Sequence, residues 1–353
     1  MTDNGRREPD KAAPSADEQV SAGSSPPPGS GYTGSGNLAR TGVRKRRGDQ
    51  IFSGLTGLAS LLILVIIAAI AIFLISRALP ALRDDSSNFL TEKQFLTDQK
   101  PPVFGIGALA FGTVLTSLLA VVMAVPVAVG VALFVTEYAP PKIGRPLGYL
   151  VDLLAAVPSV VYGLWGVGFL LSRSEGLQTW LQDHLSWIPL FKNDVGAVGR
   201  SIFLASIVLA VMILPIVAAI SREVFTQVPQ ANREAALALG ATKLEMIRTA
   251  VLPYSMSGVV SAIMLGLGRA LGETIAIALV LSASFEVSIQ VLRSTGGNTI
   301  AANIATKFGE ADPTGRGALI ATGLVLFVIT LAVNMVARGI IYRNGRLDTK
   351  GAA

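Results

Sequence analysis

Long apolar stretches without charge alternate with short polar segments along most of the chain. Five stretches contain no Asp, Glu, Lys, Arg or His, and they cover residues 51–75, 103–136, 153–172, 201–221 and 317–337. A sixth stretch, residues 254–285, is interrupted only by Arg269 and Glu273. A helix needs roughly 20 apolar residues to cross the hydrocarbon core of a bilayer. The pattern therefore predicts an all-α membrane protein with six transmembrane helices.

The composition agrees with an integral membrane protein and removes several kinds of chemistry. Of the 353 residues, 51% are hydrophobic and 15% are charged, whereas soluble domains carry about 25% charged residues. The chain has no cysteine and a single histidine, His184, which excludes disulfides and makes a zinc or haem site a poor hypothesis. Because Arg269 and Glu273 are the only charged residues inside the spans, we expect no catalytic residue, bound metal or cofactor. An integral membrane enzyme is the least favoured class.

The first 47 residues differ from the rest of the chain. They are rich in Ser, Gly, Pro and charge, which predicts a disordered tail because they bury too little apolar surface to offset the entropy of ordering. A basic run, Arg44-Lys45-Arg46-Arg47, directly precedes the first span. The positive-inside rule places that side of the span in the cytoplasm. This anchoring role is favoured over nucleic-acid binding for the basic run.

Six spans return the C-terminus to the cytoplasm as well. Basic residues follow the last span there: Arg338, Arg343, Arg346 and Lys350. The predicted organisation is a cytoplasmic tail at 1–47, a transmembrane domain at 48–341 with a cytoplasmic loop at 222–253, and a C-terminal tail at 342–353.

The loop at 222–253 has the signals of two short helices. Strong helix formers run from Glu234 to Leu239, and Gly240 suits the left-handed residue that closes a helix. Thr242 followed by Glu245 predicts a capping box at the start of a second helix, which we expect to end before Pro253. Two roles are equally compatible with these residues. The first helix could dock into a groove on another protein, or the pair could simply pack under the membrane.

The charged pair in the sixth stretch is the second informative feature. Residues four apart share a helix face, so a continuous helix would bring Arg269 and Glu273 together near the bilayer centre. Gly268 and Gly272 would form a small-residue ridge beside them for close helix packing. Ionisable residues in spans are costly and usually functional, and an arginine facing a cavity suits an oxyanion. The alternative is an ion pair that serves helix packing alone.

The cytoplasmic loop resembles the signature of the permease subunits of ABC importers. The matching residues are Glu234-Ala235-Ala236, Gly240 and Leu252-Pro253, while Ala250 stands where the family usually has Ile. The resemblance implies that the loop couples the membrane domain to an ATPase subunit. No Gly is followed by Lys anywhere in the chain, so the phosphate-binding loop of an ATPase is missing. ATP would be used by a partner subunit.

Further segments are similar to phosphate-specific permeases, and to the C-type (PstC-like) subunit among them. These segments are Gly268 to Thr274, Val157 to Gly163, Glu137-Tyr138-Ala139-Pro140 and Asn298 to Phe308. The resemblance implies a type I importer permease with a five-helix core plus an N-terminal span, in a bacterial cell membrane. It also implies that Arg269 and Glu273 act in phosphate translocation.

The partners implied by the same resemblance are a second, homologous permease subunit, two ATPase subunits and an extracytoplasmic phosphate-binding protein, besides membrane lipid. No nucleic-acid partner is expected. Two alternatives remain open: a permease for another oxyanion, such as sulfate or molybdate, and a membrane component that signals phosphate status.

Overall fold

The computed structural model describes residues 47–96, 101–295 and 297–350. The tail predicted at residues 1–47 therefore lies almost entirely outside the described residues. The chain divides into two units, residues 1–60 and 61–353. The described part of the first unit is the beginning of helix α1 (Arg47–Asp84).

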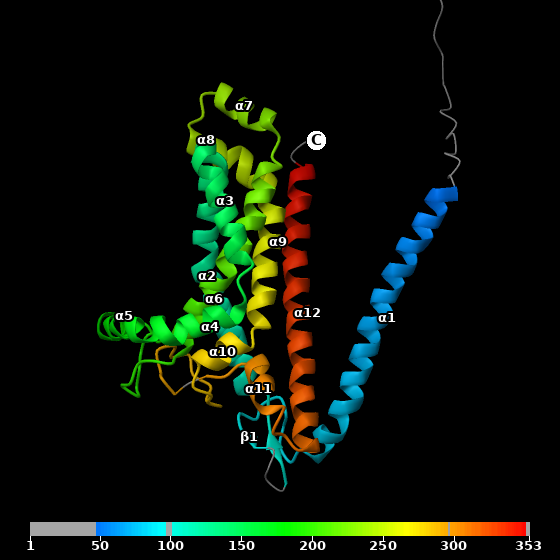
Figure 1. Ribbon diagram of the computed structural model, residues 1–353, viewed down its shortest axis with the longest axis vertical. Coiled ribbons are helices and arrows are strands. Elements are labelled where there is room, and N and C mark those ends of the chain that lie inside the picture. The colour runs from blue at the N-terminus through cyan, green and yellow to red at the C-terminus, as the bar shows by residue number, and fades with distance from the viewer. Residues whose placement is uncertain (1–46, 97–100, 296, 351–353) are drawn as a thin grey trace, which may run out of the picture. The chain divides into compact units, whose positions relative to one another are not determined.

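Helices form most of the second unit (Figure 1). The long helices after α1 are α2 (Gly107–Leu133), α6 (Ile202–Thr226), α9 (Leu252–Leu271) and α12 (Pro313–Lys350). The shorter helices are α3 (Pro141–Ala155), α4 (Ser159–Trp165), α5 (Leu171–Leu185), α7 (Gln230–Ala238), α8 (Lys243–Met246), α10 (Ile275–Val280) and α11 (Ile300–Lys307). Three π-helical turns extend or join them: η1 (Phe134–Tyr138), η2 (Gly166–Leu170) and η3 (Ile247–Val251).

Five continuous helical segments in the described residues are long and apolar enough to cross a membrane, and a sixth is counted if one bent pair is a single span. They contain the predicted stretches 51–75 and 317–337 and nearly all of 103–136 and 201–221, so four of the six predictions are confirmed in position. The helix that includes α8 and α9 runs from Lys243 to Leu271. The last helix, α12, continues to Lys350, past the boundary expected at residue 341.

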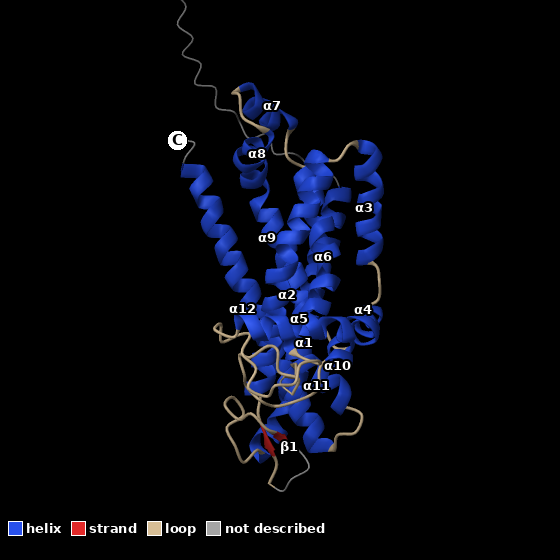
Figure 2. Cartoon of the chain, turned by 90° about the vertical axis from the view of Figure 1, so that its left-hand side faces the viewer, coloured by secondary structure: helices blue, strands red, loops and turns tan. Residues whose placement is uncertain are grey.

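The predicted span at residues 153–172 is not one continuous helix. The helix that begins this region is α3, which starts at Pro141, and a break at 156–158 separates it from the helix that starts with α4 at an angle of 91° (Figure 2). Pro158 lacks a backbone N–H, and it restricts Val157 to extended conformations. The charge-free stretch therefore covers the end of one helix, a sharp bend and the beginning of another.

A stripe of small buried residues on α2 forms the centre of the bundle. Every fourth residue of α2 is small and buried: Ala108, Gly112, Thr116, Ala120, Ala124, Ala128 and Ala132. Residues four apart lie on one helix face, and small side chains allow close helix approach in a membrane. The stripe shares its hydrophobic clusters with large buried residues of α6, such as Leu209, Ile213 and Val217. The two helices thus form one tightly packed pair.

The two ends of the second unit are built differently. The helices α7 and α8 lie at the same end as the C-terminal end of α12, and the strand β1 lies at the opposite end (Figures 1 and 2). There β1 (Phe95–Leu96) pairs antiparallel with β2 (Val103–Phe104). Buried aromatic and aliphatic residues, including Phe104 and Leu319, fill the core of this end.

Candidate functional site

The loop between α6 and α9 has the local structure that its sequence predicts. The helix α7 ends at Ala238, and Gly240 follows with a φ of +84°, in the left-handed region. Thr242 caps the next helix with a complete capping box. The backbone N–H of Thr242 donates to Glu245 Oε2 at 2.7 Å, and the N–H of Glu245 donates to Thr242 Oγ1 at 3.4 Å. The prediction of two short helices broken at Gly240 is confirmed.

The expected end of the second helix before Pro253 is wrong. The chain stays helical from α8 through the π-helical turn η3 into α9, where Pro253 occupies the first turn. A π-helical turn shifts the hydrogen-bond register of the backbone, and the first turn of a helix needs no N–H from proline. The loop is therefore joined to the α9 membrane helix without a flexible break.

One face of α7 is exposed and the other lies against the membrane domain. Glu234, Ala235 and Ala238 are exposed, and the side chain of Leu239 is 90% exposed. On the inner face Ala236 packs against a hydrophobic cluster that includes Phe225 and Met246. Leu252 packs against the same cluster. In the predicted coupling motif, Glu234 and Ala235 are therefore exposed, whereas Ala236 and Leu252 pack against the membrane domain.

Arg233, which the sequence analysis did not single out, fixes the inner side of α7. Its guanidinium donates to Glu137 Oε1 at 3.0 Å and to the carbonyl oxygens of Phe225 at 2.7 Å and Val228 at 2.6 Å. Glu137 lies in η1, and 6% of its side chain is exposed. The sequence offered two signals for these residues. Arg233 directly precedes Glu234 of the coupling motif, and Glu137 begins the segment Glu137-Tyr138-Ala139-Pro140. Nothing in the sequence shows that residues 96 apart meet.

The prediction that Arg269 and Glu273 share one helix face is wrong. The helix α9 ends at Leu271, and Glu273 lies in the short break before α10. Its Oε1 accepts a hydrogen bond from the backbone N–H of Ala276 at 3.1 Å, and 8% of the residue is exposed. Glu273 thus caps α10. The structure describes both side chains, and Arg269 and Glu273 form no ion pair with each other.

Two broken helices meet next to Glu273. Gly163 of α4 is so close to α10 that a Cβ atom on it would lie 2.8 Å from the Cα of Ala276. Across the bend between α3 and α4, the Tyr162 hydroxyl donates to the carbonyl oxygen of Leu154 at 2.8 Å. Broken helices in a membrane persist where protein groups or a cavity satisfy the freed backbone. Tyr162 and Glu273 do so at the two breaks.

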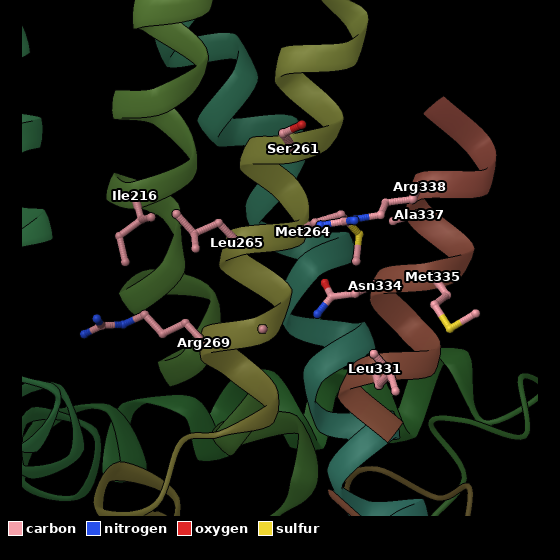
Figure 3. Close-up of a pocket in the computed structure, with 11 residues that line it drawn as sticks. Ile216, Ser261, Met264, Leu265, Arg269, Leu331, Asn334, Met335, Ala337 and Arg338 are labelled. Carbon is pink, nitrogen blue, oxygen red and sulfur yellow. The ribbon is translucent and has the colours of Figure 1, made fainter. Parts of the chain in front are cut away.

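Arg269 lies two residues before the end of α9 and is exposed. In Figure 3 its side chain extends away from α12, whereas Arg338 extends from α12 toward α9. Between these helices is a groove of about 810 Å³ with a mostly apolar lining that includes Met264, Leu331 and Met335. Among the residues that the structure describes, no carboxylate pairs with Arg269.

Gly268 and Gly272 make no close contact with another helix within the described residues. A Cβ atom on Gly268 would meet nothing within 4 Å, and one on Gly272 would come closest to its own helix, at 3.6 Å from the carbonyl oxygen of Gly268. The close helix packing at the small-residue ridge therefore stays a prediction.

The apolar helices, the helix breaks and the capped loop agree with a transport protein of the membrane. Residues 110–343 match the family of binding-protein-dependent transport system inner membrane components, and the chain belongs to that family. It is a multi-pass protein of the cell membrane.

Relatives of this chain carry a more specific description. It is 50% identical to the phosphate transport system permease protein PstC 2 of Mycobacterium tuberculosis over 84% of this chain and 92% of that protein. It is 37% identical to the phosphate transport system permease protein PstC of Haemophilus influenzae over 86% of this chain and 95% of that protein.

A solved structure has the same fold at low sequence identity. It is that of a bacterial ABC transporter involved in the import of the acidic polysaccharide alginate, with a TM-score of 0.50 and 16% identity, over 82% of this chain and 99% of the solved chain.

Proposed function

We infer that this chain is the membrane permease subunit of an ATP-driven importer of inorganic phosphate. The observation that carries this conclusion is the 50% identity to a phosphate transport permease over 84% of the chain. The exposed, capped coupling loop is consistent with it. The chain is not an enzyme, because members of this family are transport components and ATP hydrolysis belongs to a separate subunit.

The topology that fits this function has six spans and both termini in the cytoplasm. Five helices and the bent pair of α3 with α4 and α5 supply up to six spans. The coupling loop and the end of α12 lie at one end (Figures 1 and 2), in agreement with a cytoplasmic position for both. The five helices from α2 onward would be the type I core, and α1 would be the additional N-terminal span.

The exposed face of α7 is the proposed contact with the ATPase. It carries the small residues Ala235 and Ala238 beside the large apolar side chain of Leu239, which is 90% exposed. A helix with such a face suits a groove on a partner protein. Glu234 and Gly240 complete the outward side, while Leu252 and Pro253 join it to α9. Two ATPase subunits, a second permease subunit and an extracytoplasmic phosphate-binding protein complete the proposed importer.

Arg269 is the proposed phosphate contact in the translocation path. An arginine in a membrane helix is expensive without a partner, and its planar guanidinium offers paired donors to an oxyanion. Glu273 supports this site indirectly in our proposal, since it fixes α10 at the break that follows Arg269. Gly268 and Gly272 leave room for the second permease subunit beside Arg269.

The test is uptake of labelled phosphate by the full importer in proteoliposomes. We expect Arg269→Gln to abolish uptake while the subunits still assemble. Arg145→Gln, which removes an exposed arginine of α3, is the matched control and should retain uptake. Normal uptake in Arg269→Gln would refute the assignment of this residue. Competition by sulfate or molybdate as effective as that by phosphate would refute the substrate.

Coupling is tested separately at Gly240. A β-branched residue is strained at a φ of +84°, so we expect Gly240→Val to distort the turn between α7 and α8. ATP hydrolysis should then continue with little phosphate uptake. Wild-type uptake in this variant would contradict the coupling role of the loop.

A further inference from the structure

The π-helical turn η1, at the end of α2, contacts both helices of the coupling loop. Glu137 of η1 accepts hydrogen bonds from Arg233 of α7, at 3.0 Å from Nη2 and 3.3 Å from Nε. The next residue, Tyr138, lies under the ammonium group of Lys243 of α8, with Nζ 4.8 Å from the ring centroid. Because α7 and α8 stand on either side of Gly240, η1 holds the loop on both sides of its turn.

Arg233 also joins α7 to α6. Besides the ion pair, it donates to the carbonyl oxygens of Phe225, in the last turn of α6, and Val228, just beyond it. Carbonyl groups at the end of a helix lack partners within the helix, and the C-terminal end of the helix dipole favours a cation. One guanidinium thus binds three oxygen atoms from two segments, and its planar fork of five donors fixes their geometry more strictly than the three rotatable donors of an ammonium would.

The ion pair is shielded from water. Only 19% of the Arg233 side chain and 6% of the Glu137 side chain are exposed. Salt and solvent screen a buried pair much less than an exposed one, and removal of one partner leaves a buried charge without compensation. Beneath the pair, Ala132, Phe225 and Met246 belong to one hydrophobic cluster. A displacement of α7 therefore acts on α2 and α6 together.

We propose that Glu137 and Arg233 are positioning residues that transmit the motion of the coupling helix into the membrane helices α2 and α6. The inference rests on the proposed function, because the displacement of α7 comes from the ATPase. The small-residue stripe of α2 carries the motion further, since α2 and α6 are packed as one pair. Motion passes through rigid, contiguous contacts of this kind.

A second ion pair in the chain provides the matched control. Arg222 of α6 donates to both carboxylate oxygens of Asp152 in α3, at 2.9 and 3.1 Å. It has the same chemistry and also involves α6, but it does not touch α7 or α8. Its side chains are 24% and 46% exposed. Asp152→Asn therefore removes an ion pair without disturbing the contact that we propose to be essential.

The experiment measures phosphate transported per ATP hydrolysed in the full importer, reconstituted with both permease subunits, the ATPases and the binding protein. We expect Glu137→Gln and Arg233→Lys to lower this ratio by about tenfold, with ATPase subunits still co-purifying. Asp152→Asn should change the ratio by less than about twofold. A wild-type ratio in assembled Glu137→Gln or Arg233→Lys, or an equal loss in Asp152→Asn, would overturn the proposal.

Two further variants keep the result decisive. If Glu137→Gln and Arg233→Lys do not assemble, Lys243→Gln removes only the contact with Tyr138 and should lower the ratio by about twofold; an unchanged ratio then overturns the proposal. Gly240→Val separates this inference from the function on which it rests. If Gly240→Val uncouples transport while Glu137→Gln does not, the inference alone fails. If wild-type uptake does not need ATP, the proposed function itself fails.

Discussion

The coupling loop and the pair of helix breaks are both interruptions of helices, yet they are held by different forces. In the loop, the turn is set by residues next to each other in the chain, Gly240 and the capping box of Thr242 and Glu245. At the breaks, α4 and α10 are held by contacts between distant residues, such as Gly163 with Ala276. The turn at Gly240 is therefore set by local contacts, although the distant contact of Arg233 with Glu137 attaches α7 to η1. A break inside the membrane must have its freed backbone groups satisfied by other parts of the protein.

The largest effect is expected where the two breaks touch. A Cβ atom on Gly163 would lie 2.8 Å from the Cα of Ala276, and a backbone atom cannot move aside as a side chain can. We expect Gly163→Ala to destabilise the permease by about 1–3 kcal/mol, the usual cost of overpacking. Thermal unfolding of the purified chain in detergent measures this.

The control for this substitution is Gly168→Ala in η2. A Cβ atom there meets nothing within 4 Å, so its stability should remain close to that of the wild type. Equal stability of the two variants would show that the contact between α4 and α10 does not hold the breaks together.

A smaller effect is expected at the bend between α3 and α4. Tyr162→Phe removes the hydroxyl that donates to the carbonyl oxygen of Leu154, and loss of such a bond costs about 1–2 kcal/mol. Amide hydrogen exchange around residues 154–162 should increase. Tyr254→Phe is the control, because that side chain is 54% exposed. If both variants exchange alike, the Tyr162 hydroxyl does not stabilise the bend.

The difference between local and distant contacts also explains what the sequence could and could not predict. Long charge-free stretches locate membrane helices because span length is fixed by the bilayer, and the turn at Gly240 follows from neighbouring residues. The helix α3 was missed because Lys142, Arg145 and Asp152 interrupt its apolar pattern, although Asp152 is paired with Arg222. The end of α9 before Glu273 depends on how α10 packs on α4.

The ion pair of Glu137 and Arg233 could not be predicted for the same reason. Its residues are 96 positions apart, and each by itself is an ordinary charged residue near the end of a span. The resemblance to importer permeases indicates the loop as the coupling region, and that role stays a prediction. It did not identify the residue that attaches the loop to the membrane helices.

In the coupling loop the expected effect is local. Thr242→Ala removes the side chain that caps α8 and should cost about 1 kcal/mol, because the N–H of Glu245 loses its acceptor. Limited proteolysis between α7 and α8 should become faster, while the thermal stability of the membrane helices stays nearly unchanged. Thr249→Ala is the control, since that hydroxyl donates only to the carbonyl oxygen of Glu245 in the preceding turn. A large loss of overall stability in Thr242→Ala would contradict the view that this turn is locally determined.

The smallest effect is expected at Asp194, where a distant contact is exposed instead of buried. Gln290 donates a hydrogen bond to the Asp194 carboxylate, and Lys192 lies beside it with Nζ 3.0 Å from Oδ1. These two contacts, Gln290 first, hold the pKa of Asp194 below its ordinary value.

The sign of the pH dependence follows from this lowered pKa. The stabilisation of the folded loop by the charged Asp194 carboxylate is fully present above the ordinary pKa of an Asp side chain. It is lost as the pH falls through the lowered pKa of Asp194 in the folded state. Amide exchange in the loop between α5 and α6, corrected for its intrinsic pH dependence, should therefore rise modestly in acid, and Asp194→Asn should remove that dependence. The contact joins residues 96 apart, as the ion pair at Glu137 does, but 57% of the Asp194 side chain is exposed. If acid weakened this exposed contact as much as Gly163→Ala weakens the helix breaks, the strength of a contact would depend on the distance along the chain between its residues. It would then not depend on burial.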